Sequence, residues 1–344
     1  MPNAPQREKA VQLQLAVTRP REPSFAEGNL GELPLFVLNT QDARPELSKD
    51  LERVIDLGVG PDGGHRRLTI MVGSAGYPTM FAALVLQVII ERALEEGLDS
   101  PVVYVTRHYI ARRLRYRRPQ ASDFRRIDMA CEKLTAVKLK LENTWYAKAP
   151  RAQIEAAREN PSIPPARGAR PSDLDIQGLL DAVHFRQTRK PDGSLDDRSY
   201  VKLSDKLFES IKNGYLYPVG LDFLLALNSS VAQRVYLYLA KKDDNGQYVE
   251  DLKSFAKKVG LKKTAPSAIL DALAPALKQL AGELEVSMRD GFIEIHRFLE
   301  EWKVDTASGN IIFRFFRENQ RPQQQPAKNE FVAAIERIRA GARK

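Results

Sequence analysis

Residues 102–140 read VVYVTRHYIARRLRYRRPQASDFRRIDMACEKLTAVKLK, and this stretch decides the expected fold of the first half of the chain. No acidic residue lies between Asp99 and Asp123. The same interval holds Arg107, Arg112, Arg113, Arg115, Arg117 and Arg118. Such a density of positive charge without local acids is typical of a surface that faces a polyanion.

Apolar residues in this stretch recur at helical spacing, first at Ile110 and Leu114, then at Phe124, Ile127, Cys131 and Leu134. The two amphipathic segments are separated by an Arg-Pro break at residues 118–119, so the pattern predicts a helix-turn-helix. We expect Thr106 to cap the first helix, and Ser122 or Asp123 to cap the second. Residues 137–145 then alternate between polar and apolar side chains, which predicts a strand.

Composition agrees with a folded, basic protein. The chain of 344 residues is long enough for about two domains. Its 53 Lys and Arg against 44 Asp and Glu give a net charge of +9, which favours nucleic acid or another anionic surface. The single cysteine, Cys131, excludes an internal disulfide and is compatible with a reducing compartment. With no long apolar run and no signal-peptide pattern, we interpret the chain as cytoplasmic and without a membrane partner.

Outward from the basic stretch, the sequence predicts a hairpin of residues 53–59 and 66–72 around PDGG. It also predicts a buried helix that starts near Pro78, with the proline in its first turn, and ends at Gly97. A second unit follows, with a helix at 229–241, a short helix before Gly260, a longer one after it, a hairpin at 283–298 and a strand at 310–316. Helix, helix, turn, helix and hairpin is the order of a winged helix, and it occurs twice. The predicted fold class is therefore α+β, with two tandem winged-helix domains made of helix-turn-helix motifs and β-hairpin wings.

The expected organisation has four parts. Residues 1–29 form a flexible N-terminal segment, and residues 30–214 form the first winged-helix domain with a Pro- and Arg-rich insertion at 147–172. Residues 215–318 form the second winged-helix domain, and residues 319–344 form a linker and a basic C-terminal helix.

We find no pattern for catalysis. There is no phosphate-binding loop with its lysine, the four histidines are scattered, and Cys131 falls on an apolar helix face without a histidine near it in sequence. The sequence thus predicts a protein that is not an enzyme and has no catalytic residue, metal site or cofactor.

The helix-turn-helix defines the candidate DNA contacts. In this motif the second helix enters the major groove, while the preceding helix and the wing hold phosphates. The polar face of the second helix supplies the base-reading candidates, which are Ser122, Arg125, Arg126, Met129 and Lys133. The basic residues around it, with a weaker edge of the second unit, supply the phosphate candidates, which are Arg107, Arg112, Arg113, Arg115, Arg117, Arg118, Lys138, Lys140, Lys262, Lys263 and Ser267.

Three further segments carry a resemblance to a known family. They are LPLF at 33–36, GYPT at 76–79, and LSDKLFESIKNGYLYPVGLDFLLALNSSVAQRVYLYLAKK at 203–242. With the order of parts, they make residues 30–318 similar to plasmid replication initiator proteins of the replication initiator A type. A motif of that family, at the helix that opens the second domain, is matched by Leu227, Ser229, Arg234, Tyr236 and Leu239. The Pro-rich insertion departs from the family pattern.

This resemblance implies two winged-helix domains that bind repeated double-stranded sites at the origin of a plasmid or secondary replicon. It also implies local opening of the DNA, recruitment of the host initiator ATPase and replicative helicase, and a balance between monomer and homodimer. Two other classes stay open: a winged-helix transcriptional repressor, which could regulate its own promoter, and a non-replicative DNA-binding adaptor whose second unit binds protein only.

Overall fold

The computed structural model describes residues 17–18, 24–39, 41–43, 51–59, 64–146, 175–185, 199–243, 246–287 and 293–317. Several predicted features lie outside these residues: the Pro-rich insertion, the C-terminal helix, most of the N-terminal segment, and the turns of the two predicted hairpins at residues 61–63 and 290–291. The fold is α+β with small antiparallel sheets, which agrees with the predicted class at this level.

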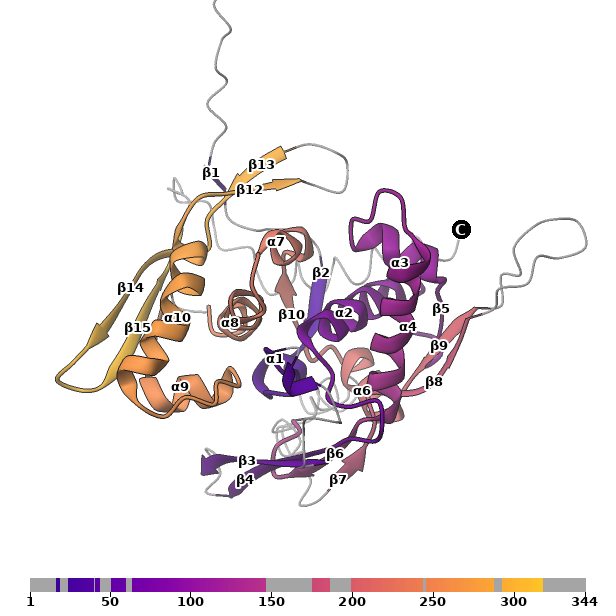
Figure 1. Ribbon diagram of the computed structural model, residues 1–344, viewed down its shortest axis with the longest axis horizontal. Helices are drawn as coiled ribbons and strands as arrows, with labels where there is room; N and C mark the ends of the chain where they lie inside the picture. Colours follow the sequence, from indigo (N-terminus) through magenta and orange to yellow (C-terminus); the bar gives the residue numbers. More distant parts are fainter. Residues whose placement is uncertain are drawn as a thin grey trace, which may run out of the picture.

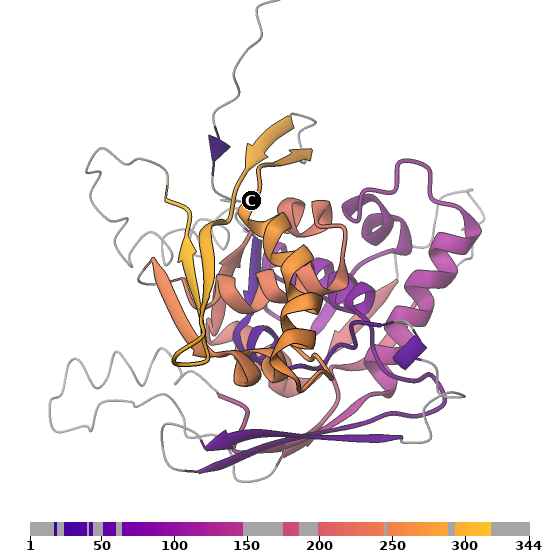
Figure 2. The same cartoon turned by 60° about the vertical axis from the view of Figure 1, so that its left-hand side comes forward.

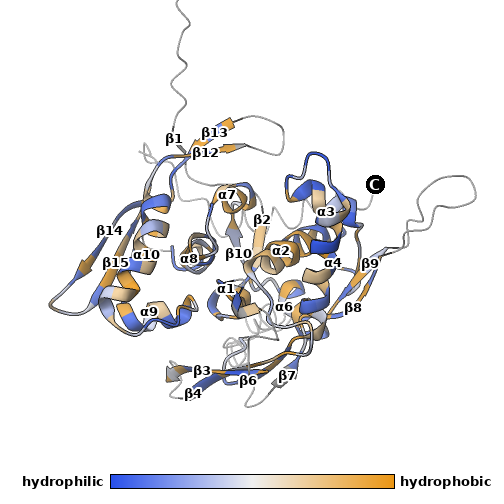
Figure 3. Ribbon diagram, in the orientation of Figure 1, coloured by the Kyte–Doolittle hydropathy of each residue, from blue (hydrophilic) through white to orange (hydrophobic). Residues whose placement is uncertain are grey.

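The first unit is built around a buried helix, as the sequence predicts. That helix, α2 (Met80–Glu95), ends where Gly97 adopts a φ of 87°, a conformation that glycine reaches without a steric penalty. The rest of the unit comprises β5 (Val102–Tyr104), α3 (Arg107–Arg113), α4 (Ala121–Ala136), β8 (Leu180–His184) and β9 (Tyr200–Leu203). Figure 3 shows α2 mostly in the hydrophobic colours, whereas α3 and the loop after it are largely blue.

The second unit repeats this order of elements. It comprises α8 (Ser230–Ala240), β11 (Gln247–Asp251), α9 (Leu252–Lys258), α10 (Pro266–Ala281), β14 (Leu299–Asp305) and β15 (Asn310–Phe315). In both units the strand after the first helix pairs with the last strand, so the sheet orders are β5-β9-β8 and β11-β15-β14. The duplication inferred from the sequence is thus present in the connectivity.

Each unit carries an additional pair of strands between its third helix and its hairpin. In the second unit the pair is β12 (Leu284–Ser287) and β13 (Ile293–His296), and β13 also pairs in parallel with β1 (Val17–Thr18). The predicted hairpin at 283–298 therefore has its two paired strands, and the predicted strand at 310–316 pairs with β14 and β11. Strand β14 was not predicted, because its sequence LEEWKVD is rich in charge and most of its side chains are only partly covered.

In the first unit the additional strands join the predicted hairpin. Strands β3 (Glu52–Val59) and β4 (His65–Met71) pair antiparallel, and β6 (Lys138–Glu142) and β7 (Asp175–Gln177) complete a four-stranded sheet in the order β3-β4-β6-β7. Leu139 and Leu141 are buried on one face of β6, as the alternation of that segment predicts. Figure 2 shows this sheet running beneath the helices.

Between the two units lie elements from the N-terminal part and from the middle of the described chain. They are β2 (Ser24–Glu27), α1 (Gly28–Glu32), the short 3-10 helix η1 (Gln41–Ala43), α6 (Asp205–Lys212), β10 (Leu216–Val219) and α7 (Leu221–Ala226). Strand β2 pairs antiparallel with β10. Figure 1 shows this pair beside α2 and α8, with the first unit on one side and the second on the other.

The expectation of a flexible segment up to residue 29 is wrong for residues 24–29. Ser24, Phe25, Glu27 and Asn29 are all buried, and the Glu27 carboxylate accepts hydrogen bonds from Ser210 Oγ at 2.6 Å and from the Leu30 amide at 2.8 Å. The mean polarity of the segment pointed to disorder, but these polar groups find partners inside the protein. The other predicted domain boundaries remain predictions.

The residues that carry the family resemblance have structural roles at this junction. Ser229 caps α8 by accepting a hydrogen bond from the Ala232 amide at 3.0 Å. Arg234 is buried and donates to the carbonyl oxygens of Leu30 at 3.1 Å and of Lys258 at 3.0 Å, so its guanidinium joins α1 to the end of α9. Tyr236 accepts from the Gly220 amide at 2.7 Å. Leu227 and Leu239 are buried.

Candidate nucleic-acid interface

Helix α4 has one buried face and one exposed face. Ile127, Ala130, Cys131 and Leu134 are buried, and α4 packs against α2 and α3. The helix begins earlier than expected, because the N-cap is Gln120, whose amide donates to the carboxylate of Asp123 at 2.8 Å. The predicted cap at Ser122 or Asp123 is thus wrong, although Asp123 does stabilise the first turn. The predicted cap of α3 is confirmed, since Thr106 Oγ1 accepts from the Tyr109 amide at 3.1 Å.

The five base-reading candidates share the outer side of α4, but their side chains differ in exposure and in contacts with the rest of the protein. Ser122, Arg125 and Met129 are exposed. Arg126 is exposed too, yet its guanidinium lies 3.9 Å from the ring centre of Phe81 and donates to the Tyr116 hydroxyl at 3.2 Å. Lys133 is half-buried, and its ammonium donates to the carbonyl oxygens of Ala43 at 3.4 Å and Tyr77 at 3.3 Å. Burial lowers the pKa of Lys133.

The phosphate candidates divide into surface residues and residues held in ion pairs. Arg112, Arg117, Arg118 and Lys138 are exposed. Lys140 pairs with Glu142 at 3.2 Å on the same strand. Arg107 pairs with Asp128 of α4 at 2.8 Å and lies over the ring of Phe185, so it fixes α3 against α4.

Arg113 and Arg115 correct the interpretation that every arginine of this stretch faces outward. Arg113 is buried, and its guanidinium donates to Glu91 at 2.6 and 2.9 Å and to Asp222 at 3.0 Å. Arg115 also forms an ion pair with Asp222, whose side chain is fully buried. Because Glu91 lies on α2 and Asp222 on α7, these arginines stabilise the junction of the two units instead of forming an open phosphate surface.

In the second unit the candidate residues lie at the start of α10. Lys262, Lys263 and Ser267 are exposed, in and just after the connection from α9. Along α10 the exposed positions are Pro266, Ser267, Asp271, Pro275 and Lys278. The helix is continuous through Pro275, and Pro266 occupies its first position. This face is less basic than that of α4.

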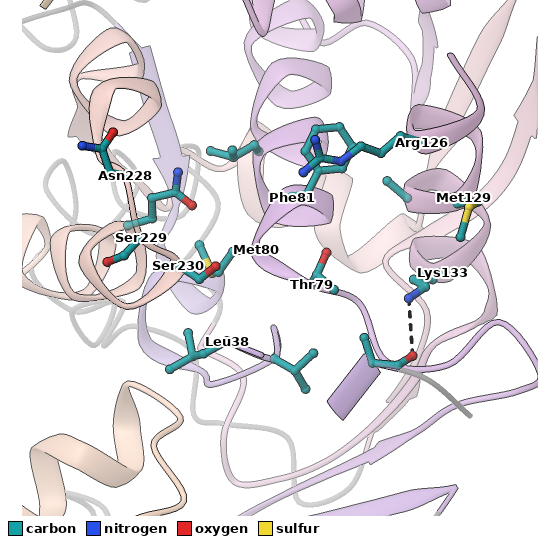
Figure 4. A pocket seen from close by; sticks show the side chains of 15 residues that line it. Leu38, Thr79, Met80, Phe81, Arg126, Met129, Lys133, Asn228, Ser229 and Ser230 are labelled. Atoms are coloured by element: carbon teal, nitrogen blue, oxygen red, sulfur yellow. Dashed lines mark hydrogen bonds between the residues drawn. The ribbon is translucent and has the colours of Figure 1, made fainter. Parts of the chain in front are cut away.

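A cleft with a volume of about 440 Å³ adjoins the outer face of α4. It is bounded by α4, by the start of α2, by the start of α8 and by residues 37–38 and 43. Figure 4 shows Arg126, Met129 and Lys133 on one side of this space and Asn228, Ser229 and Ser230 on the other, with Phe81 of α2 between them. The cleft was not predicted, because its walls come from segments about 100 residues apart in the sequence.

Cys131 is buried, and burial with the nearby Asp128 charge raises the pKa of its thiol to about 12, so the thiol is a poor nucleophile at neutral pH. Among the residues that the structure describes, no group of three or more His, Cys, Asp or Glu side chains has the arrangement of a metal site. Within the same residues, no helix is both long and apolar enough to cross a membrane.

Comparison with known proteins finds similarity in structure but not in sequence. No described protein family and no curated protein matches the sequence. Two crystal structures of domains 2 and 3 of RctB are similar in overall arrangement. The first, of a selenomethionine derivative, has a TM-score of 0.49 and 11% sequence identity, and the match covers 84% of this chain and 98% of that chain. The second has a TM-score of 0.45 and 11% identity, and covers 80% of this chain and 95% of that chain.

Proposed function

We propose that the chain is a sequence-specific double-stranded DNA-binding protein that acts as a replication initiator at repeated sites of a plasmid or secondary-replicon origin. The observation that carries this proposal is the exposed face of α4, where Ser122 and Arg125 lie in the first two turns of a helix. A recognition helix offers its N-terminal residues to base edges, and the planar fork of arginine suits the two acceptors of guanine.

The connectivity supports two winged helices. In each unit a helix, a strand and two further helices precede a hairpin, and the early strand pairs with the last strand of that hairpin. We assign the hairpins β8–β9 and β14–β15 as the wings, and α4 and α10 as the third helices. Two such units on one chain would meet major grooves about one helical turn of DNA apart, which suits tandem repeats.

The proposed mechanism needs no hydrolysis by this chain. Exposed arginines around α4 would hold phosphates while Arg125 and its neighbours read bases. Binding at adjacent repeats would bend or open neighbouring A·T-rich DNA, and the assembled protein would recruit the host initiator ATPase and the replicative helicase. A balance between monomer and homodimer would control the activity in this scheme, and the chain would reside with the plasmid or nucleoid DNA.

The test has two stages. First, selection from a pool of random duplexes with the full chain should enrich a defined sequence, and that sequence should recur near the gene in tandem direct copies beside an A·T-rich tract. Second, a plasmid that carries only this gene and its flanking DNA should persist in a suitable host. Enrichment of a lone inverted repeat without plasmid persistence would indicate a repressor. Failure to enrich any duplex would overturn the DNA-binding proposal itself.

A further inference from the structure

The charged side chains that line the cleft beside α4 are all positive. Among the described residues that bound it, the ionisable side chains are Arg126 and Lys133, and no carboxylate is present. Hydroxyl and amide groups of Thr79, Asn228, Ser229, Ser230 and Gln233 complete its polar part. The remaining surface is apolar and comes chiefly from Leu38, Met80, Phe81, Leu84 and Met129. Such a lining suits a ligand that has an anionic group attached to an apolar body.

Both cations are held in place. The contact of Arg126 with the Phe81 ring and its hydrogen bond to Tyr116 fix the plane of the guanidinium. The two carbonyl contacts of Lys133 fix its ammonium at the edge of the cleft. Side chains that are already ordered lose less conformational entropy when an anion binds. The two cationic groups of the cleft are therefore preorganised for an anion.

The position of the cleft relates it to DNA. With 3.6 residues per helical turn, Arg126, Ala130 and Lys133 lie on the side of α4 next to Ser122, Arg125 and Met129. A duplex whose major groove received the outer face of α4 would present one sugar-phosphate strand along that side. Deoxyribose supplies the apolar body and the phosphate supplies the anion.

We propose that this cleft binds one phosphate and the adjoining sugar of the DNA strand that borders the groove entered by α4. This inference rests on the proposed function. Because α8 of the second unit forms the wall opposite α4, the same phosphate would connect the second unit to DNA bound by the first. Free inorganic phosphate shares the chemistry of the anion, so the experiment must distinguish the two sources.

The experiment introduces one negative charge into the cleft without disturbing the fold. Ser230→Asp places a carboxylate in the first turn of α8, where a negative charge is compatible with the helix dipole. Asn228→Asp is a second variant, nearly identical in shape, at an exposed position of the same wall. The matched control is Ser100→Asp. Ser100 is exposed beyond the opposite end of α2, and its hydroxyl accepts a hydrogen bond from Val102 that a carboxylate can also accept.

Affinity for a random-sequence duplex is measured by fluorescence anisotropy across a series of salt concentrations. When the protein neutralises one phosphate fewer, the slope of log K against log salt should become shallower by about 0.9. We expect this reduction, with about tenfold weaker binding at low salt, for Ser230→Asp and Asn228→Asp, and wild-type behaviour for Ser100→Asp. Unfolding midpoints of the three variants establish that each is folded.

Two results would overturn the inference while leaving the proposed function intact. One is equal DNA binding by the cleft variants and the Ser100→Asp control. The other is that inorganic phosphate or pyrophosphate protects the wild type, but not Ser230→Asp, against thermal unfolding while the salt slopes agree, since the cleft would then serve a free anion. If the wild type binds no duplex, the proposed function fails, and this inference fails with it.

Discussion

Helices α4 and α10 occupy the same place in the two units, and both have 16 residues, but their outer faces differ. When their buried faces are superposed, Ile127, Ala130, Cys131 and Leu134 correspond to Leu273, Ala276, Leu277 and Leu280. Under this correspondence Arg125 of α4 matches Asp271 of α10. Met129 matches Pro275, and Lys133 matches Gln279.

The difference shows that duplicated architecture need not mean duplicated chemistry. A carboxylate at the position of Arg125 cannot donate to phosphate or to the acceptor edge of guanine, although it can accept from cytosine. Around α10 the exposed positive residues lie instead before the helix, at Lys262 and Lys263, and near its end, at Lys278. We infer that α4 supplies most of the base reading, while the second unit supplies phosphate contacts around its own third helix.

The largest effect should follow from breaking the ion pairs that join the first unit to α7, between the compared units. Asp222→Ala leaves Arg113 and Arg115 without the carboxylate between them, and removal of one partner from a buried ion pair costs about 3–5 kcal/mol. Urea denaturation followed by circular dichroism measures this change in the free energy of unfolding. Asp181→Ala, which removes an exposed ion pair with Lys202, should have a much smaller effect. Equal losses of stability for the two variants would show that the junction does not depend on this cluster.

A second ion pair at the junction should depend on pH. Burial alone would raise the pKa of Glu32, but Lys241 and Lys242 of the second unit lower it from 4.5 to about 2. Since the folded pKa is depressed, the stabilisation is present above pH 4.5 and is lost as pH falls toward 2. Glu32→Gln should therefore cost on the order of 3 kcal/mol at pH 7 and progressively less below pH 4.5. Unfolding midpoints at pH 7, 4 and 3 test this, and a pH-independent difference would contradict it.

Substitutions at the corresponding positions of the two helices test the comparison directly. Arg125→Ala should reduce the preference for particular base pairs by about 1–3 kcal/mol. Asp271→Ala should leave the preference unchanged and tighten binding slightly, because it removes a negative charge. Competition between the selected duplex and random duplex measures both. Equal loss of preference in the two variants would show that α10 reads bases as α4 does.

The smallest effect should come from the basic edge of the second unit. Lys262→Ala and Lys263→Ala should each weaken binding to specific and random duplexes alike, and each should make the salt slope shallower by at most about 0.9, the value for one phosphate. Anisotropy titrations over a salt series measure the slope. Lys253→Ala, which removes an exposed lysine from the preceding helix, is the control. An unchanged slope in both lysine variants would show that this edge does not contact DNA phosphates.

Local sequence patterns predicted individual helices and strands better than they predicted which elements pack or pair with one another. The cap at Thr106, the end of α2 at Gly97 and the burial of Leu139 and Leu141 depend on residues a few positions apart, so the sequence reveals them. Strand β14 was not predicted because its many charged side chains obscure the alternation of polar and apolar residues that is typical of a strand. The burial of Ser24 was missed because its strand partner lies on β10, nearly 200 residues away.

The same limit explains what was missed at the candidate site. The exposed face of α4 follows from helical spacing, and its five candidate residues do share one side of the helix. The absence of acids near Arg113 in sequence suggested a surface residue, yet its partners Glu91 and Asp222 lie 22 and 109 positions away. Counting local charges cannot detect such pairs. The cleft could not be predicted from the sequence for the same reason, because its walls come from distant segments that meet only in the folded protein.

The pairing of β2 with β10 has a consequence for the synthesis of the protein. The first four residues of this buried segment, 24–27, leave the ribosome early, whereas their partner strand at 216–219 follows much later. The β2–β10 pair between the two units therefore cannot form until translation has passed β10. A nascent chain halted before β10 would expose Phe25 and Ala26, which are buried in the finished protein, to other chains and to chaperones.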